Sequence, residues 1–380
     1  MPEVRPVGGV ALHREWVADW AQMSCSGRNL TALLVNSMES AELAGLLIAA
    51  LRLDVPAVVA TPLADPFAVA LAALGVAPLV EASTEEIVEE IVRDGGPRPG
   101  EIVDGFSLAN SLRAGLALGG GPELLVHLAA MAREAGVTGF TQTLRVLIPE
   151  SPKVVAPESA WFNAHGPTGF LAYLGDALHD RPTVVGRLKE TLPPAPPAPQ
   201  ESGSRLIFVR GRASGTEVLC RVDEGLAEVS GDCRIYSSEG AAVRAVWDSA
   251  VYPDDLLVVA GCGPRGGPGL LRLDSLGDAL REAGLVGTVP VLTDGLSPEG
   301  VPGVWASLTT PEAAVGGIIG RLRSGDRLRL DFVEARITTG VRAGEIDSRE
   351  TYAVPGASGT GYVARYAGLA LPALEGAGFD

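Results

Sequence analysis

Apolar positions in the first half of the chain follow two alternating patterns, which predict helices and strands in turn. Apolar residues repeated every three or four positions and bounded by helix-breaking residues indicate helices, whereas short apolar runs indicate buried strands. Helices are predicted at 14–23, 41–53, 66–74, 84–93 and 124–135. Strands are predicted at 33–36 and 57–60. Because strands alternate with helices, this half of the chain predicts an α/β domain with a parallel sheet.

A proline-rich segment, PPAPPAP at 193–199, separates this half from a different pattern. Dense prolines cannot continue a helix and favour an extended spacer, so we predict a domain junction there. Beyond it, β-rich runs between glycine turns predict strands at 205–209, 217–221, 233–236, 256–260, 289–292 and 327–331, and helices at 239–248 and 275–283. The expected organisation is an N-terminal α/β domain over 1–192, a linker over 193–204, and a C-terminal β-barrel-like domain with flanking helices over 205–380.

Composition narrows the choice of partners and compartment. The 380-residue chain carries 30 basic and 46 acidic residues, a net charge of −16, which argues against nucleic acid or an anionic membrane as its main partner. Its most apolar stretch, 43–80, is interrupted by charges and prolines and does not predict a membrane span. The N-terminus lacks the pattern of a signal peptide. The four cysteines show neither zinc-ligand spacing nor a disulfide framework, so we expect free thiols in a cytoplasmic protein.

Two segments of the second half carry candidate chemistry. The residues 261–266 fit the pattern GxGxxG after a predicted strand, which is typical of a dinucleotide site, but Pro264 and Pro268 interrupt the turn into a helix. A glycine-rich loop after a strand is the simpler interpretation. Asp294 follows another predicted strand, where it can be a functional carboxylate or a cap for the next turn. In the first half, His127 lies in a predicted helix, where a structural histidine is more common than a base.

Several of these segments resemble one protein family. The loop GPRGGPG at 263–269, the run LTDG at 292–295, the run TPEAAVGG at 310–317 and the helix HLAAMAREAG at 127–136 are similar to motifs of the IlvD/Edd family. This family contains the dihydroxy-acid and sugar-acid dehydratases. The resemblance implies an N-terminal α/β domain, a C-terminal barrel domain and a dimer. It also implies an iron–sulfur cluster held by three cysteines, Mg²⁺, and a serine that removes the α-proton of the substrate.

The chain departs from this family where the resemblance places the cofactors. The family's Cys-Asp-Lys run falls on Glu39, Ser40 and Ala41, and an earlier magnesium aspartate falls on Arg5. The glutamate before the glycine-rich loop falls on Cys262. The family's base serine falls on Pro298, beside Ser297, and a segment with a third cluster cysteine is missing. The resemblance therefore implies that this chain uses neither the cluster nor Mg²⁺, so no cofactor is expected.

The remaining polar set defines the candidate site. We expect catalytic roles for Glu39, Cys262, Asp294 and Ser297, with Glu39, Cys262 and Asp294 in one cleft, and substrate binding by Ser40, Arg265 and His127. A carboxylate and a thiol in place of metal ligands suit acid–base chemistry on a small carboxylic acid, of the lyase or isomerase type, in specialised metabolism. The alternative is a catalytically inactive partner subunit, a pseudoenzyme. Either would be a homodimer or part of a heteromeric complex.

Overall fold

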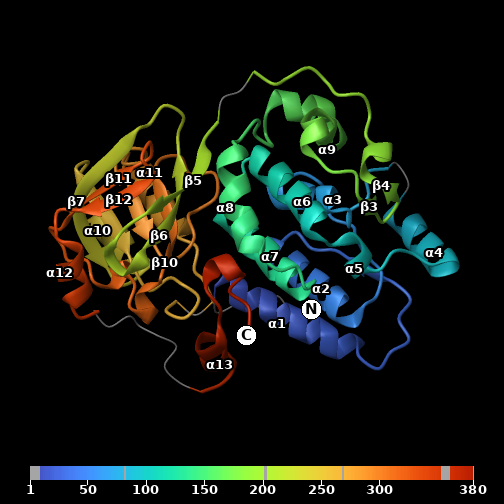
Figure 1. Cartoon of the computed structure of the whole chain (residues 1–380), viewed down its shortest axis with the longest axis horizontal. Coiled ribbons are helices and arrows are strands. Elements are labelled where there is room, and N and C mark those ends of the chain that lie inside the picture. Colours follow the sequence, from blue (N-terminus) through green and yellow to red (C-terminus); the bar gives the residue numbers. More distant parts are fainter. Residues whose placement is uncertain (1–8, 81–82, 201–202, 268, 352–359, 380) are drawn as a thin grey trace. The chain divides into compact units, whose positions relative to one another are not determined.

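The computed structural model describes residues 9–80, 83–200, 203–267, 269–351 and 360–379 (Figure 1). The chain divides into two compact units, each described here by itself. The helical unit is His13–Gly203. The barrel unit comprises the described residues of Ser204–Asp380 together with residues 9–12, whose Val10 and Ala11 donate backbone hydrogen bonds to Leu270 and Gly269. None of the helices in the described ranges combines the length and apolar character needed to span a bilayer.

The helical unit contains the predicted parallel sheet, reduced to two short strands. The strands β1 (Leu33–Val35) and β2 (Ala57–Val59) pair in parallel, with Leu33 opposite Ala57. A second small pair, β3 (Pro182–Thr183) and β4 (Gly186–Arg187), is antiparallel. The helices are α1 (Val10–Cys25), α2 (Ser40–Leu53), α3 (Pro66–Leu74), α4 (Thr84–Asp94), α5 (Pro99–Ile102), α6 (Gly105–Ala117), α7 (Pro122–Glu134), α8 (Phe140–Glu150) and α9 (Ala160–Leu174).

Helix α3 is the buried centre of this unit, and its sequence explains its bounds. The Asp65 carboxylate accepts hydrogen bonds from the backbone N–H groups of Phe67 and Ala68, and Pro66 occupies the first turn, as a helix start requires. Gly75 ends the helix with a φ of 103°, a conformation that glycine adopts without strain. The residues 67–74 are all buried, because α3 is apolar on every side and packs against α6.

The barrel unit contains a closed eight-stranded barrel, as the β-rich pattern predicted. Its strands are β5 (Arg205–Arg210), β6 (Glu217–Val222), β7 (Glu228–Tyr236), β8 (Asp255–Val259), β9 (Val291–Thr293), β10 (Trp305–Thr310), β11 (Arg327–Asp331) and β12 (Arg336–Thr339). They follow one another around the barrel in the order β10-β6-β5-β12-β11-β7-β8-β9. Its helices are α10 (Glu239–Trp247), α11 (Asp274–Glu282), α12 (Ala343–Ser348) and α13 (Tyr362–Leu369). The mixed α/β class predicted for the whole chain is therefore confirmed.

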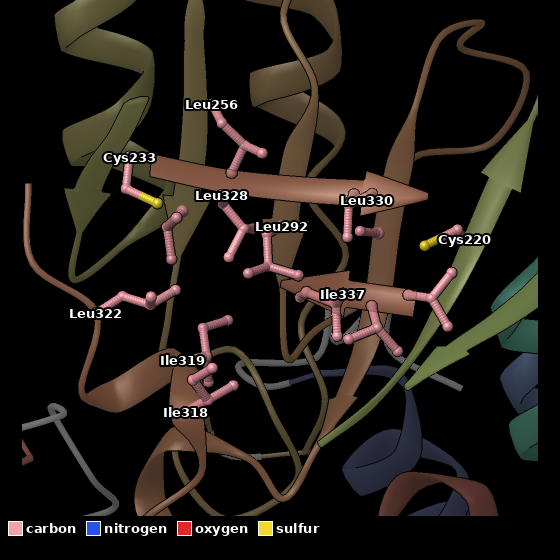
Figure 2. Packing of buried hydrophobic residues seen from close by; sticks show 14 of the residues in the cluster. Cys220, Cys233, Leu256, Leu292, Ile318, Ile319, Leu322, Leu328, Leu330 and Ile337 are labelled. Atoms are coloured by element: carbon pink, nitrogen blue, oxygen red, sulfur yellow. The ribbon is translucent and has the colours of Figure 1, made fainter. Parts of the chain in front are cut away.

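Strand β8 is buried on both faces and joins two hydrophobic clusters. Leu256 and Val258 belong to the cluster inside the barrel, which Figure 2 shows together with Leu292 and Leu328. Leu257 and Val259 point the other way, as the two-residue period of a strand dictates, into a cluster that contains residues of α10 and α11. A strand buried on both faces appears in the sequence as a continuous apolar run, which is why DLLVVA was recognised.

The strands β7, β8, β9 and β10 pair in parallel. Their carboxyl ends therefore lie at one end of the barrel, and the segments that follow β8, β9 and β10 come together there. In sheets with parallel strands, this is the edge at which ligands bind.

Candidate active site

Asp294 connects the three segments that meet at this end of the barrel. It follows β9 and is only 1% exposed. Its carboxylate accepts backbone N–H groups from Gly261 at 3.2 Å and Cys262 at 2.8 Å, both after β8, and from Ala313 at 2.9 Å, after β10. Burial raises the pKa of Asp294, and these three hydrogen bonds oppose the rise. These hydrogen bonds join Asp294 to two neighbouring segments, and none of the three goes to the turn that follows Asp294.

Glu312 is a second buried carboxyl group, which the sequence analysis did not single out. It follows β10 and is 7% exposed. Its carboxylate accepts the backbone N–H groups of Arg265 and Gly266, each at 3.1 Å to Oε2. Burial, and after it the neighbouring charge of Asp294, raises the pKa of Glu312 to about 7. The run TPEAAVGG was recognised as a family motif. Glu312 is its only charged residue, and this was the signal in the sequence that could have identified it as a site residue.

The glycine-rich loop owes its glycines to this carboxyl group and to the loop's own tight turn. A Cβ atom at Gly263 would lie 2.2 Å from Oε2 of Glu312, and one at Gly267 would lie 2.5 Å from the carbonyl oxygen of Gly261. Glu312 already accepts the backbone N–H groups of Arg265 and Gly266, so these two donors of the loop are not free for a pyrophosphate. The next helix, α11, begins only at Asp274. The loop therefore supports the simpler interpretation over a dinucleotide site.

A pocket of about 320 Å³ opens beside both carboxyl groups, within the barrel unit. Its lining residues are Pro264, Arg265, Asp294, Thr309, Thr310, Pro311, Glu312, Val315, Pro372 and Ala373. The half-buried Arg265 donates from Nε to the carbonyl oxygen of Ala370 at 2.8 Å, which holds the guanidinium group at the pocket wall. The pocket thus presents one arginine and two carboxyl groups, which suits binding of a small acid and transfer of its protons.

Cys262 and Ser297 are near lining residues of this pocket in the sequence, but their own side chains do not line it. Cys262 is 1% exposed, and its side chain belongs to the cluster that contains residues of α10 and α11. Burial raises the pKa of its thiol, with a smaller contribution from Asp294, so the neutral thiol predominates. Ser297 is 2% exposed, and its Oγ has no hydrogen-bond partner among the described residues. The structure therefore brings Cys262 and Asp294 together through the backbone N–H of Cys262.

The other candidates belong to the helical unit. Glu39 is exposed and precedes α2, and Ser40 is the half-buried first residue of that helix. Because they belong to a different unit from Cys262 and Asp294, the common cleft expected for Glu39, Cys262 and Asp294 stays a prediction.

His127 is fully buried in α7 as part of a polar network. Its Nδ1 lies 3.4 Å from Nη1 of Arg14, and its Nε2 lies 3.3 Å from Oε1 of Glu123. Burial lowers the pKa of His127 and favours the neutral ring. Arg14, itself fully buried, also donates from Nη2 to Oε1 of Glu15 at 2.8 Å. These contacts support a structural role for His127.

The donor atoms present do not fit an iron–sulfur cluster. Within the described ranges, no three His, Cys, Asp or Glu residues gather as a metal site. Cys220 and Cys233 lie in the barrel core, on opposite sides of Leu292 and Leu328 in Figure 2. Burial raises the pKa of both thiols, whereas iron is bound by thiolates. Arg5, which falls on a magnesium position of the family, lies outside the described residues.

Comparisons with known proteins agree with this architecture. Residues 209–377, which include most of the barrel, the glycine-rich loop and both buried carboxyl groups, match the family model of the dihydroxy-acid/6-phosphogluconate dehydratase C-terminal domain. The dihydroxy-acid dehydratases of Geobacter metallireducens and Trichlorobacter lovleyi are each 31% identical over 319 residues, which cover 78% of this chain and 57% of the relative. Dihydroxy-acid dehydratase 2 of Bordetella bronchiseptica is 30% identical over 317 residues, 77% of this chain and 55% of the relative.

The chain therefore belongs to the dihydroxy-acid/6-phosphogluconate dehydratase family, the IlvD/Edd family named by the sequence motifs. It spans a little over half the length of the curated relatives it matches.

Proposed function

We propose that this chain is a lyase- or isomerase-type enzyme that moves a proton on a small carboxylic acid, in specialised metabolism, without an iron–sulfur or magnesium centre. The observation that carries the proposal is the position of Glu312, whose pKa is raised to about 7, at the wall of a 320 Å³ pocket beside Asp294 and Arg265. A carboxyl group with a pKa near neutrality can both accept and return a proton under physiological conditions.

The chemistry follows from these three residues. Arg265 binds the substrate carboxylate through its guanidinium group. The Glu312 carboxylate takes the proton from the carbon next to that carboxylate, and the electron pair of the broken C–H bond moves into the carboxylate. In a lyase, this pair then expels a hydroxyl group from the neighbouring carbon. The hydroxyl receives the proton from Glu312 and leaves as water. In an isomerase, Glu312 returns the proton to carbon instead.

Hydrogen exchange at the substrate carbon tests this proposal. The protein, kept in EDTA, is incubated in D₂O with a panel of branched 2-hydroxy and 2,3-dihydroxy acids, and the α-proton signal is followed by NMR. We expect at least one acid to lose this signal, and Glu312→Gln to abolish the loss. Glu334→Gln, at an exposed position of the barrel unit, is the matched control and should exchange like the native chain. A panel without any exchange, or unchanged exchange in Glu312→Gln, would overturn the proposal.

The alternative is an inactive partner subunit, homodimeric or bound to another protein. It is supported by the backbone hydrogen bonds of Asp294 and Glu312, because a carboxylate satisfied by N–H groups can act as a fastener of loops alone. Sedimentation analysis of the chain alone, and with an intact dehydratase of the same family, tests it. Association only with the intact enzyme, together with no exchange activity of the chain itself, is the result that favours this alternative.

A further inference from the structure

A second pocket of the barrel unit, about 520 Å³ in volume, shares no lining residue with the one beside Glu312. Its walls come from the end of β5 and the segment after it, from Ile318, and from β12 and the segment after it. The lining residues are Arg210, Gly211, Arg212, Ala213, Ile318, Arg336, Ile337, Thr338, Thr339, Val341 and Ala343. Pockets of this volume hold small organic molecules.

The lining of this pocket carries charge of one sign. Arg210, Arg212 and Arg336 line it, and none of its lining residues is acidic. The chain as a whole has 46 acidic residues against 30 basic ones, so the pocket is positive in a strongly negative protein. Such a concentration of one charge in a concave site attracts the opposite charge.

Strand register places two of these arginines side by side. Arg336 is the register partner of Arg210 where β12 pairs with β5 in parallel, and like charges opposite each other destabilise a sheet. On its other side, Arg210 donates from Nε to Oε1 of Glu217 at 2.9 Å, which compensates one of the three positive charges. Arg336 has Asp331 as its register partner in β11.

The carboxylate of Asp331 has other hydrogen-bond partners. The Asp331 carboxylate accepts hydrogen bonds from Arg329 and from the backbone N–H groups of Val333 and Glu334. Arg212 is exposed and makes no side-chain hydrogen bond or ion pair within the described part of the chain. The guanidinium group of Arg336 forms no hydrogen bond within the described residues, and its charge interacts with Asp331 at longer range. The planar forks of the Arg212 and Arg336 guanidinium groups match the oxygens of a carboxylate or phosphate group.

The rest of the lining is apolar with two hydroxyl groups. Ile318 and Ile337 are 2% and 4% exposed, and Val341, Ala213 and Ala343 complete the apolar part. Thr338 and Thr339 carry the hydroxyl groups, and the Thr339 hydroxyl donates to the carbonyl oxygen of Val341 at 2.6 Å. A ligand that fits both parts carries one oxyanion on a short apolar body.

We infer that this pocket binds a small organic oxyanion, a carboxylate or phosphate group on a short hydrocarbon chain, held by Arg212 and Arg336. The inference stands independently of the function proposed for Glu312, because the two pockets are separate.

Calorimetric titration of the full chain tests the inference with three probes of one shape: isovalerate, isobutyl phosphate and the neutral isovaleramide. We expect at least one of the two anions to bind, and the amide to bind at least about tenfold more weakly because it lacks the charge that a guanidinium recognises. The tighter anion identifies the oxyanion. Equal affinity for the amide, or no binding of either anion, would overturn the inference.

Variants assign the binding to this pocket. Arg212 and Arg336 are exposed, so folding tolerates their replacement by Gln. Arg212→Gln and Arg336→Gln should each lower the affinity for the anion by about tenfold or more. Arg327→Gln, an exposed arginine of the same barrel outside the pocket, is the matched control and should bind like the native chain. Glu312→Gln should also leave the affinity unchanged. Native affinity in both pocket variants, or loss of binding in Glu312→Gln alone, would contradict the assignment.

Discussion

The carboxylate of Asp294 accepts the backbone N–H of Cys262 at 2.8 Å, although the two residues are 32 positions apart in the sequence. Through this bond and those to Gly261 and Ala313, one side chain holds together the segments that follow three parallel strands. Burial, and after it the charge of the same side chain, raises the pKa of Glu312, so the loop structure and the protonation of Glu312 both involve Asp294.

Replacing Asp294 by Asn should destabilise the barrel unit. An amide has one acceptor oxygen, and its NH₂ group would face backbone N–H donors, so at least one buried donor loses its partner. Such a loss costs about 1–3 kcal/mol of the free energy of unfolding, measurable by urea denaturation. Asp278→Asn, on the exposed side of α11, is the control and should change stability by less than about 0.5 kcal/mol. Equal stability of the two variants would show that the hydrogen bonds of Asp294 contribute nothing.

Glu312 should make the stability of the chain depend on pH in a defined window. Burial raises its pKa from 4.5 to about 7 in the folded state, so the folded chain keeps a proton that the unfolded chain releases at lower pH. The stability linked to this proton is therefore complete below about pH 4.5 and is lost as the pH rises through about 7.

Comparison with Glu312→Gln reports this titration, because the variant lacks it and every group that does not interact with Glu312 cancels. The free energy of unfolding of the native chain, minus that of the variant, should fall by up to about 3 kcal/mol between these two pH values. Urea denaturation at several pH values measures the difference. A difference that stays constant with pH would mean that Glu312 ionises in its usual range.

The buried pair Arg14 and Glu15 should be important for the helical unit. Arg14 is fully buried and donates from Nε and Nη2 to Oε1 of Glu15, and Glu15 is 2% exposed. Removing the guanidinium leaves a buried carboxylate whose remaining ion pair among the described residues is with Arg52, 3.6 Å away. Arg14→Met should therefore cost about 3 kcal/mol in unfolding free energy, and Arg14→Lys less. Arg28→Met, at an exposed site, should be neutral within about 0.5 kcal/mol, and a similar loss in all three variants would refute the expectation.

The helices and strands that could be predicted are those with clear local sequence signals. Helix α3 has Asp65 and Pro66 at its start and Gly75 at its end, so its bounds 66–74 were predicted as they are found. Helix α6 was missed, because Asn110 and two serines interrupt its apolar pattern. Asn110 is satisfied by the backbone of His179, 69 residues away, a partner that no local pattern reveals. The strands β10 and β12 were missed for a related reason, since threonines and an arginine mask their apolar positions.

The residues of the candidate site, too, could be predicted only where a local sequence pattern marked them. Asp294 was predicted because it follows an apolar strand. Glu312 was missed because its role depends on N–H groups 46 and 47 positions earlier in the chain. Cys262 was expected to be catalytic from its place before the glycine-rich loop, and the sequence could not show that its side chain points into a hydrophobic cluster. Direction and long-range pairing are properties of the folded chain, and one sequence contains them only implicitly.

Reconstitution with iron and sulfide under anaerobic conditions should leave the protein colourless. An iron–sulfur cluster needs several thiolates that converge on one point. Cys220 and Cys233 lie in the barrel core with raised thiol pKa values, Cys262 belongs to a different hydrophobic cluster, and Cys25 lies in α1. Binding iron would require these buried thiols to ionise and the barrel to open. Visible absorption and the iron-to-protein ratio after desalting measure the outcome, with an intact dehydratase of the family as the positive control. Iron retained at cluster stoichiometry would show that this chain builds a cluster site from other residues, and the metal-independent chemistry proposed for Glu312 would have to be abandoned.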